Sequence, residues 1–486
     1  MKPRMFLSRR AVIARLSAAG AALAGVAAAR AAETDQPAPT RRAAARSGNA
    51  RQLIAERVNQ TPLIDTHEHL IDEPERLRGA GQAGVRCDDW ALLLSHYLDS
   101  DLLTAGMPRS DLDRFLSAEV EPAAKWTLLA PYWPRVKHTG YAQAVRIAIR
   151  ELYGVDDLSA ATVERVQAEY EKTRCAGFYE RILRDRANIE SCQVNCIFGA
   201  PFKESVSPTL LMQDLSIVGM FAGPSIEQYG RPSGIEVKAL SDWHRVIDWW
   251  FDRYAKYAVA VKSQDAYSRD IDYARVPPEQ AAPVFKRVLD KETVTAEERK
   301  LMQDHLFWYA VDQATRHGLP VKLHTGYYAG QSWMPLERLA RNAASAGELC
   351  RLSRDTQFVF MHICYPFYED LLAVAKHWSN AWVDMCWAWI INPIAAKDYV
   401  KKHLVTAPAN KLLPFGGDYI PVEPVLGHAA LARRGLARAL WELVGEGWLS
   451  LDEALDLVEP ILRGNARRLF QIDKKTEALR QAPWVR

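Results

Sequence analysis

An apolar run that ends in two histidines at alternate positions stands near the start of the folded part of the chain. Its residues are Leu63-Ile64-Asp65-Thr66-His67-Glu68-His69. The first four predict a short buried strand. Because side chains two positions apart on a strand point to the same side, His67 and His69 can face one metal ion while Glu68 points away. The run therefore predicts a metal site at the end of a first strand.

Further apolar runs follow along the 486 residues, separated by long helical stretches. This alternation is typical of parallel strands joined by crossover helices. The expected strands are residues 63–66, 193–198, 216–221, 257–262, 319–324, 357–362, 381–386 and 412–417. The expected helices between them are residues 241–255, 295–317, 334–346, 368–377 and 424–446. Eight such strands predict an α/β protein built as a (β/α)8 barrel, or TIM barrel.

The connection between the first two expected strands is far longer than the others, at about 125 residues. Its helical segments are residues 90–98, 110–117, 141–153 and 160–186. A connection that leaves the carboxyl end of a barrel strand lies on the catalytic face, so we expect residues 71–190 to cap that face. Residues 451–472 predict a closing helical pair, and residues 476–486 are interpreted as a C-terminal tail.

Polar residues recur where later strands end. His324 closes the strand 319–324, His362 closes 357–362, and Asp418 follows 412–417. Taken singly, each could be a buried histidine or a helix-capping aspartate. Barrel active sites are assembled from the carboxyl ends of different strands, and the recurrence favours one shared site.

Other candidates follow the same strands. Lys262 ends the fourth strand, where a neutral lysine would bind metal and a charged lysine would pair with an anionic substrate. Asp384, within the seventh strand, is expected to orient a ligand. Four residues are candidates for substrate binding, with a scaffold role as the alternative: Tyr267, Arg269, Tyr327 and Trp387.

The order of these motifs resembles the amidohydrolase superfamily, in particular its amidohydrolase-related (amidohydrolase 2) branch, over about residues 51–475. Residues 261–267, 324–326 and 365–367 are similar to the amidohydrolase portion of plant nodulin and fungal glutamine-synthetase-like fusion proteins. The long insertion, including residues 178–186, has a distant likeness to uronate isomerases.

This resemblance implies that His67, His69, His324 and Asp418 bind metal. It leaves His362 either a ligand of a second metal or a group that polarises the substrate. Binuclear members carry a carbamylated bridging lysine at the position of Lys262, whereas uronate isomerases and many mononuclear members do not. Nitrogen and oxygen ligands suit one or two Zn²⁺ ions, with Mn²⁺ or Fe²⁺ as alternatives.

A hydrolytic mechanism follows from the resemblance. The metal would lower the pKa of water toward about 7, and Asp418 would take its proton and pass it to the leaving group. The metal, with His362 or Lys262, would stabilise the carbonyl oxygen. We therefore expect hydrolysis of a C–N or C–O bond in a small carbonyl substrate. The alternatives are a non-hydrolytic member, such as a uronate isomerase, decarboxylase or hydratase, and an inactive binding protein.

The charge balance bears on partners. The chain has 62 basic and 59 acidic side chains, and six of the basic ones lie in residues 1–31, which contain no acidic residue. The remainder is close to neutral and has no basic block, so nothing indicates nucleic-acid or membrane-surface binding. A small-molecule substrate is the expected partner, and a homo-oligomer remains open.

Residues 1–31 resemble a secretory signal. A basic start with Arg9 and Arg10, an alanine-rich run and a small-residue pattern before Ala32 indicate cleavage there, with the twin-arginine route favoured. The alternative is an N-terminal membrane anchor, although the apolar run is shorter than the ~20 residues of a spanning helix. We expect a periplasmic or secreted enzyme, with no membrane contact after cleavage, and a disordered linker at residues 32–50.

Seven cysteines are scattered along the chain. An odd number without close pairing argues against a disulfide framework, so we interpret them as buried free thiols. No Cys-x-x-Cys pair occurs, and the sequence therefore gives no reason to expect a thiolate zinc site.

Overall fold

The computed structural model describes residues 41–217, 220, 225–331 and 333–485. It divides into residues 1–49 and residues 50–486. The expected signal at residues 1–31, and residues 32–40 of the expected linker, lie outside the described residues. Residues 41–50 are helical and begin α2 (Arg41–Gln60), where a disordered linker was expected. The arginine and alanine residues of this stretch favour helix strongly enough to explain the difference.

Parallel strands form the centre of residues 50–486. They are β1 (Leu63–Glu68), β2 (Ile189–Val194), β3 (Leu211–Gln213), β4 (Leu215–Ser216), β5 (Val261–Ser263), β6 (Val321–Leu323), β7 (Phe358–Phe360), β8 (Ala381–Asp384) and β9 (Leu412–Leu413). The strand orders are β1-β2-β3 and β4-β5-β6-β7-β8-β9. Only Asp214 separates β3 from β4; its amide donates to Val194, and that of Leu215 donates to Ala260. The two short strands therefore act as one barrel strand.

The barrel closes between β1 and the residues after β9. The amide of Thr66 donates to the carbonyl of Phe415 over 3.0 Å, and the amide of Asp418 donates to that of His67 over 2.9 Å. Because β1 also pairs with β2, the sheet has no free edge at this seam. The (β/α)8 fold expected from the sequence is confirmed, and the seam joins two of the expected metal-binding segments directly.

Two strand positions differ from the expectation. The second strand is residues 189–194, where 193–198 was expected, and the third is residues 211–216, where 216–221 was expected. The apolar pattern was misleading, because Ile197 and Phe198 lie beyond the strand end and are 41% and 37% exposed. Residues 218, 219 and 221 of the expected third strand lie outside the described residues.

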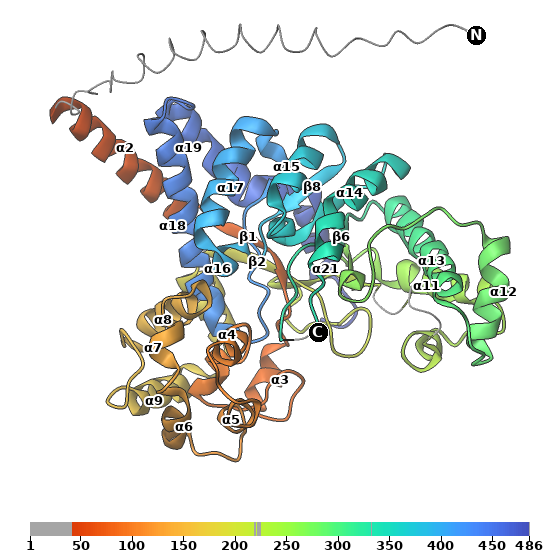
Figure 1. Cartoon of the computed structure of the whole chain (residues 1–486), viewed down its shortest axis with the longest axis horizontal. Coiled ribbons are helices and arrows are strands. Elements are labelled where there is room, and N and C mark those ends of the chain that lie inside the picture. Colours follow the sequence, from red (N-terminus) through yellow and green to blue (C-terminus); the bar gives the residue numbers. More distant parts are fainter. Residues whose placement is uncertain (1–40, 218–219, 221–224, 332, 486) are drawn as a thin grey trace, which may run out of the picture. The chain divides into compact units, whose positions relative to one another are not determined.

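The insertion between β1 and β2 is helical. Its elements are α3 (Glu73–Leu77), η1 (Trp90–Leu94), α4 (Leu98–Thr104), α5 (Arg109–Phe115), α6 (Pro122–Leu129), α7 (Trp133–Val136), α8 (Gly140–Tyr153), α9 (Val163–Thr173), α10 (Phe178–Glu180) and η2 (Arg181–Arg186). Figure 1 shows α4 to α9 grouped together beside the barrel strands. The single helix expected at residues 160–186 is broken before α10, where Gly177 has a φ of 81°.

Helices also connect the later strands and close the chain. They are η3 (Ile226–Gly230), η4 (Arg231–Ser233), α11 (Leu240–Tyr254), η5 (Asp265–Tyr267), α12 (Pro278–Leu289), α13 (Ala296–Arg316), α14 (Leu336–Leu352), η6 (Met361–Cys364), α15 (Tyr368–His377), α16 (Ala388–Ile391), α17 (Pro393–Thr406), η7 (Ala409–Lys411), α18 (Glu423–Gly445), α19 (Leu451–Glu459), η8 (Pro460–Gly464), α20 (Asn465–Leu469) and α21 (Ile472–Arg480). The helices α12 and α17 were not expected, and each begins with a proline, which is favourable at a first helical position. The helix α21 covers residues 476–480 of the expected tail, and its Leu479 is buried.

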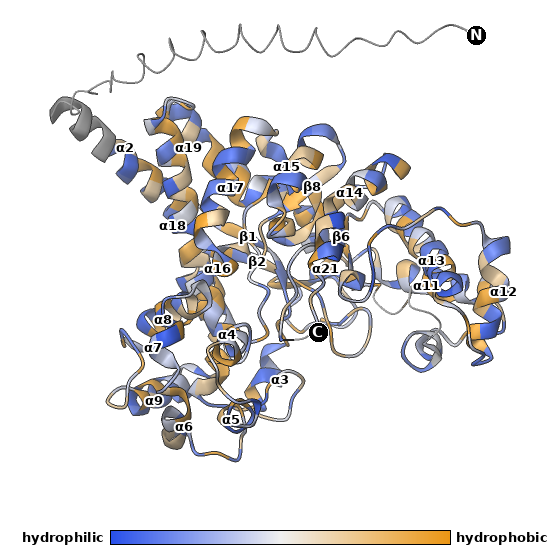
Figure 2. Ribbon diagram, viewed as in Figure 1, coloured by the Kyte–Doolittle hydropathy of each residue, from blue (hydrophilic) through white to orange (hydrophobic). Residues whose placement is uncertain are grey.

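The helices bury one face against the barrel. Figure 2 shows hydrophobic and hydrophilic residues side by side on helices such as α13, α14 and α18, as expected for amphipathic helices over a sheet. Among the described residues, no helix combines the length and the apolar composition that crossing a membrane would require.

A buried ion pair lies inside the barrel. Lys322 on β6 and Asp214 between β3 and β4 are both 0% exposed. The Lys322 ammonium lies 2.9 Å from each Asp214 carboxylate oxygen and donates to the carbonyl of Thr66 over 2.7 Å. The pair therefore links three barrel strands directly before His67.

Candidate metal centre

A cavity of about 250 Å³ that opens to solvent lies where the barrel strands end. The expected site residues that line it are His67, His69, Lys262, Tyr267, His324, His362 and Asp418. The remaining lining residues are His96, Tyr97, Ile197, Gln264 and Ala329. The structure thus brings together all six expected metal ligands, which come from five different barrel strands.

His67, His69 and Asp418 form the tightest group. Oδ1 of Asp418 lies 3.1 Å from Nε2 of His67 and 3.2 Å from Nε2 of His69. The contact with His67 lacks the alignment of a hydrogen bond. Ligand atoms about 2.0–2.1 Å from a tetrahedral zinc ion lie about 3.3 Å from one another, so these spacings fit one shared ion.

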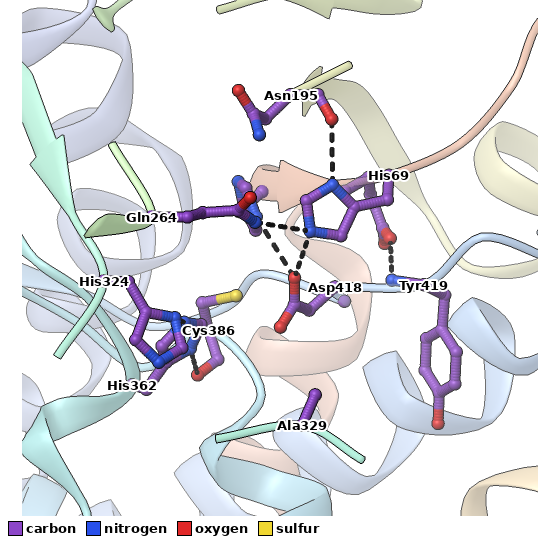
Figure 3. A network of polar contacts seen from close by, with 12 residues as sticks. His69, Asn195, Gln264, His324, Ala329, His362, Cys386, Asp418 and Tyr419 are labelled. Carbon is purple, nitrogen blue, oxygen red and sulfur yellow. Dashed lines mark hydrogen bonds and ion pairs between the residues drawn. The ribbon is translucent and has the colours of Figure 1, made fainter. Parts of the chain in front are cut away.

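The orientation of His69 supports that fit. Its Nδ1 lies 2.8 Å from the carbonyl of Asn195, which can only accept, so this nitrogen carries the proton. Nε2 is therefore the lone-pair nitrogen, and the amide of Gln264 donates weakly to it over 3.4 Å. Figure 3 shows this nitrogen directed at the Asp418 carboxylate. Such an outer partner fixes the ring as a metal ligand requires.

The protonation states of His67 and Asp418 also suit a metal ion. Burial works to raise the pKa of Asp418, but the two imidazoles against it outweigh burial and hold that pKa well below its usual range. Burial lowers the pKa of His67 well below its usual value. An ionised carboxylate beside neutral imidazole lone pairs is the donor set that a divalent cation needs.

His324 and His362 form a second pair. Nε2 of His324 donates to the carbonyl of Tyr327 over 2.9 Å, and Nδ1 of His362 donates to that of Cys386 over 3.1 Å. The remaining nitrogens face each other at 3.0 Å. Burial lowers the pKa of His362 to about 4 and that of His324 well below its usual value. Two neutral rings therefore direct lone pairs at each other, an arrangement that a shared cation would stabilise.

Lys262 lies on the same cavity wall, fully buried. Its ammonium has no hydrogen-bond partner among the described residues. Burial lowers the pKa of Lys262 to about 8, while the charge of Asp418 works in the opposite direction. An unpartnered buried amine of this kind is rare unless a ligand, a modification or a substrate completes it.

Acidic residues of β1 hold the segment that carries Asp418. A carboxylate oxygen of Glu68 accepts the amide of Tyr419 over 2.6 Å, and one of Asp65 accepts the amide of Gly417 over 3.3 Å. A Cβ at Gly417 would lie 1.8 Å from Glu68 Oε1, so only glycine fits there. As expected, Glu68 points away from the metal group, and it fixes the neighbouring loop.

Strained backbone surrounds the centre. Non-glycine residues with positive φ at the strand ends are His362, Ile363, Cys364, Trp387 and Asp418, with φ between 46° and 66°. Such conformations are costly for ordinary residues and gather at functional sites. Asp384, expected as an orienting residue, accepts from the Thr66 hydroxyl and the Cys386 amide, each over 2.8 Å.

Several site residues were not found from the sequence. His96 and Tyr97 come from the insertion, and the Tyr97 hydroxyl donates to the carbonyl of Asp418 over 2.6 Å. No local motif marks them. Asn195 directly follows β2, so a correct strand boundary would have placed it at a strand end. Gln264 stands two residues after Lys262, a spacing that could have indicated it.

Three of the proposed substrate-binding residues lie outside the cavity lining. Arg269 pairs with Asp304 at 2.5 Å and lies over the ring of Tyr273. Trp387 is buried and packs on Tyr97 at a ring distance of 4.6 Å. Tyr327 supplies the carbonyl that orients His324. These three side chains make structural contacts, and their expected role in substrate binding stays a prediction, whereas Tyr267 lines the cavity.

Comparisons with known proteins show a family likeness over part of the chain and a shared fold. Residues 258–472 match the family model described as Amidohydrolase. The fold is similar to a glucuronate isomerase from Caulobacter crescentus, with 15% identity, 90% of this chain and 96% of that chain covered, and a TM-score of 0.70. It is also similar to a uronate isomerase from Thermotoga maritima, with 14% identity, 87% of this chain and 97% of that chain covered, and a TM-score of 0.68.

A further similar structure is that of a Lactobacillus casei protein to which metal-dependent hydrolase activity has been ascribed without being established. The identity is 14%, 87% of this chain and 98% of that chain are covered, and the TM-score is 0.61. A search of curated protein sequences found no match. The likeness to nodulin and glutamine-synthetase-like fusion proteins stays a prediction. Residues 258–472 are thus similar to the Amidohydrolase family, and the fold of the chain is similar to that of these solved structures.

Proposed function

We propose that this protein is a metal-dependent hydrolase that cleaves a C–N or C–O bond of a small carbonyl compound. The observation that carries the proposal is the convergence of His67, His69 and Asp418 on one point of the cavity. The second histidine pair offers room for a second ion. Zn²⁺ suits these ligands best, with Mn²⁺ or Fe²⁺ as alternatives.

Each residue then has a defined role. A divalent ion held by these side chains would supply a water of lowered pKa and would polarise the substrate carbonyl. Asp418, ionised and buried, accepts the proton of the attacking water and returns it to the leaving group. His362 faces the same cavity with an unprotonated Nε2, which can bind an ion, whereas Lys262 can stabilise the carbonyl oxygen as its charge grows. Tyr267 and Gln264 line the cavity and can position the substrate.

Lys262 has two roles that differ in chemistry. A carbamylated Lys262 would be an anionic ligand between two ions, which favours the hydrolase. A protonated Lys262 would be a cation facing the cavity, which favours an anionic substrate. The lowered pKa of Lys262, about 8, makes its neutral form accessible near neutral pH, and the neutral amine is the form that carbamylation requires.

Sugar-acid isomerisation is the second candidate, because the fold is similar to uronate and glucuronate isomerases. Recognition of a uronate needs a cation for its carboxylate. Among the described residues that line the cavity, no arginine is present, and Lys262 is the one lysine. The isomerase reading therefore depends on Lys262 being protonated and unmodified. Decarboxylation or hydration depends on the same metal group.

A substrate screen tests the proposal. Purified, metal-loaded protein would be incubated with amides, lactones, aromatic acids and uronates, and intact mass would report the state of Lys262. Release of an acid with an amine or alcohol supports the hydrolase, whereas aldose–ketose interconversion supports the isomerase. His324→Ala should abolish turnover, and His377→Ala, at the exposed end of α15, is the matched control. Metal binding without turnover of any class would favour a binding protein.

We also propose that residues 1–31 direct export by the twin-arginine route to the periplasm or the medium. A mature N-terminus at Ala32 in the exported fraction, lost when Arg9 and Arg10 are both changed to lysine, would support this. Retention of the intact leader in a membrane fraction would support the anchor instead.

A further inference from the structure

A thiol lies beside the metal centre and was not expected to take part in it. Cys386 follows β8 by two residues and is 0% exposed. One ligand atom each of Cys386, His362 and Asp418 lies within 4.8 Å of the others. Figure 3 shows the sulfur directed toward the Asp418 carboxylate. Asp418 thus belongs to two groups of donors, one with His67 and His69 and one with His362 and Cys386.

The backbone fixes the position of this thiol on both sides. The amide of Cys386 donates to Asp384 over 2.8 Å, and its carbonyl accepts from Nδ1 of His362 over 3.1 Å. The amide of Met385 donates to the carbonyl of Leu413 over 2.9 Å. The hydrogen bond from His362 also fixes the tautomer of that ring, so that its Nε2 remains a lone-pair donor. Cys386 and His362 are therefore positioned together.

The neighbouring strand leaves room for the sulfur. A Cβ at Gly416 would lie 2.9 Å from Sγ of Cys386 and 2.8 Å from its Cβ, closer than side-chain atoms pack. Gly416 also accepts the amide of Trp387 over 3.0 Å, so the two segments cannot separate without losing that bond. Any larger residue at 416 would displace the sulfur from its position near His362 and Asp418.

We propose that Cys386 is a metal ligand, and that with His362 and Asp418 it forms a thiolate-containing second site in this enzyme. The inference rests on the metal-dependent function proposed above and adds a soft ligand to a centre of nitrogen and oxygen donors. It also revises the expectation that the chain has no thiolate metal site. A single thiolate does not need a Cys-x-x-Cys pair when other strands supply the remaining ligands.

The chemistry of the ligand has a measurable consequence. A thiol binds a divalent ion as the thiolate, so the S–H bond breaks, a sulfur–metal bond forms and one proton is released to the solvent. Thiolate ligands favour Zn²⁺ over Mg²⁺ and Mn²⁺, whereas carboxylate and imidazole alone discriminate less. We therefore expect Cys386 to make the second site prefer Zn²⁺ to Mg²⁺ or Mn²⁺.

The test compares the wild-type protein with Cys386→Ser. The control is Cys350→Ser, because Cys350 is also fully buried but lies on α14. Loaded with Co²⁺, the wild type and Cys350→Ser should show thiolate-to-cobalt charge-transfer absorption in the near ultraviolet. Cys386→Ser should lose this absorption while keeping the visible bands of the first site. The affinity of its second site for Zn²⁺ should fall by at least about 10- to 100-fold, since even loss of an outer partner has that effect on metal affinity.

The outcomes separate the two proposals. A wild-type protein that binds no metal overturns both. A wild-type protein that binds Co²⁺ without charge-transfer absorption overturns this inference and leaves the metal-dependent function standing. The wild-type spectrum alone decides the matter if Cys386→Ser fails to fold, because among the described cysteines only Cys386 is grouped with histidine and carboxylate ligands.

Discussion

Replacing Asp418 by asparagine should separate metal binding from folding. The change keeps the shape of the side chain but removes the charge that faces His67 and His69 at 3.1 and 3.2 Å. The pKa of Asp418 is held well below its usual range, so the ionised carboxylate stabilises the metal-free fold, and metal-free Asp418→Asn should unfold at a lower urea concentration than the wild type at pH 7. The wild type should gain about 4 kcal/mol from metal at 1,000 times its dissociation constant. The variant should gain little of this.

Turnover should fall further than metal binding alone would require. Loss of a general base costs about 10²- to 10⁴-fold, or about 3–5 kcal/mol in the activation barrier, and the weakened metal adds to it. Urea unfolding with and without Zn²⁺, followed by assay on the substrate found in the screen, measures both effects. Asp355→Asn, at an exposed carboxylate, is the matched control. Metal stabilisation and turnover that both survive in Asp418→Asn would refute the reasoning.

Three other changes test the surroundings of the centre. Lys262→Met should stabilise the metal-free protein by about 3 kcal/mol at pH 7, because the folded pKa of about 8 lies below the unfolded 10.5. In the wild type, the free-energy penalty of burying the charged Lys262 is constant below pH 8 and disappears between pH 8 and 10.5. The free energy of unfolding of the wild type should therefore rise over that window, and that of the variant should not. Urea unfolding curves that are the same at pH 7 and pH 10 for both proteins would contradict this. Lys322→Met should lower the free energy of unfolding by about 3–5 kcal/mol, because it leaves the buried Asp214 unpaired, and adding Asp214→Leu should recover most of that loss. A loss under about 1 kcal/mol in Lys322→Met alone would argue against a stabilising ion pair. Gly417→Ala should displace the loop from Glu68 and abolish Zn²⁺ binding in equilibrium dialysis, with Gly445→Ala, at an open position, as the control.

The expected metal ligands could be predicted from the sequence because their positions depend on where the strands end, which local apolar runs indicate. A strand end fixes where a side chain emerges, and the barrel brings the strand ends to one rim. His67 and His69 stand at the end of β1 and His324 directly follows β6, whereas His362 and Asp418 lie two and five residues beyond β7 and β9. Their convergence around one cavity therefore follows once the strands are recognised from their apolar runs.

The rest of the site depends on tertiary packing that no local pattern encodes. His96 and Tyr97 reach the cavity only because the insertion folds back over the barrel. Arg269 was expected to bind substrate, but its charge is taken by Asp304 on α13, a partner 35 residues away. The strand β2 was misplaced because it also buries polar residues such as Ser191, which interrupt the apolar pattern.

Crystals of zinc-loaded protein, with diffraction recorded on both sides of the zinc absorption edge, would locate the ion directly. An anomalous peak should lie about 2.0–2.2 Å from Nε2 of His67, Nε2 of His69 and a carboxylate oxygen of Asp418. Zinc bound only elsewhere, with these three side chains still in contact with one another and no peak between them, would contradict the proposed metal centre.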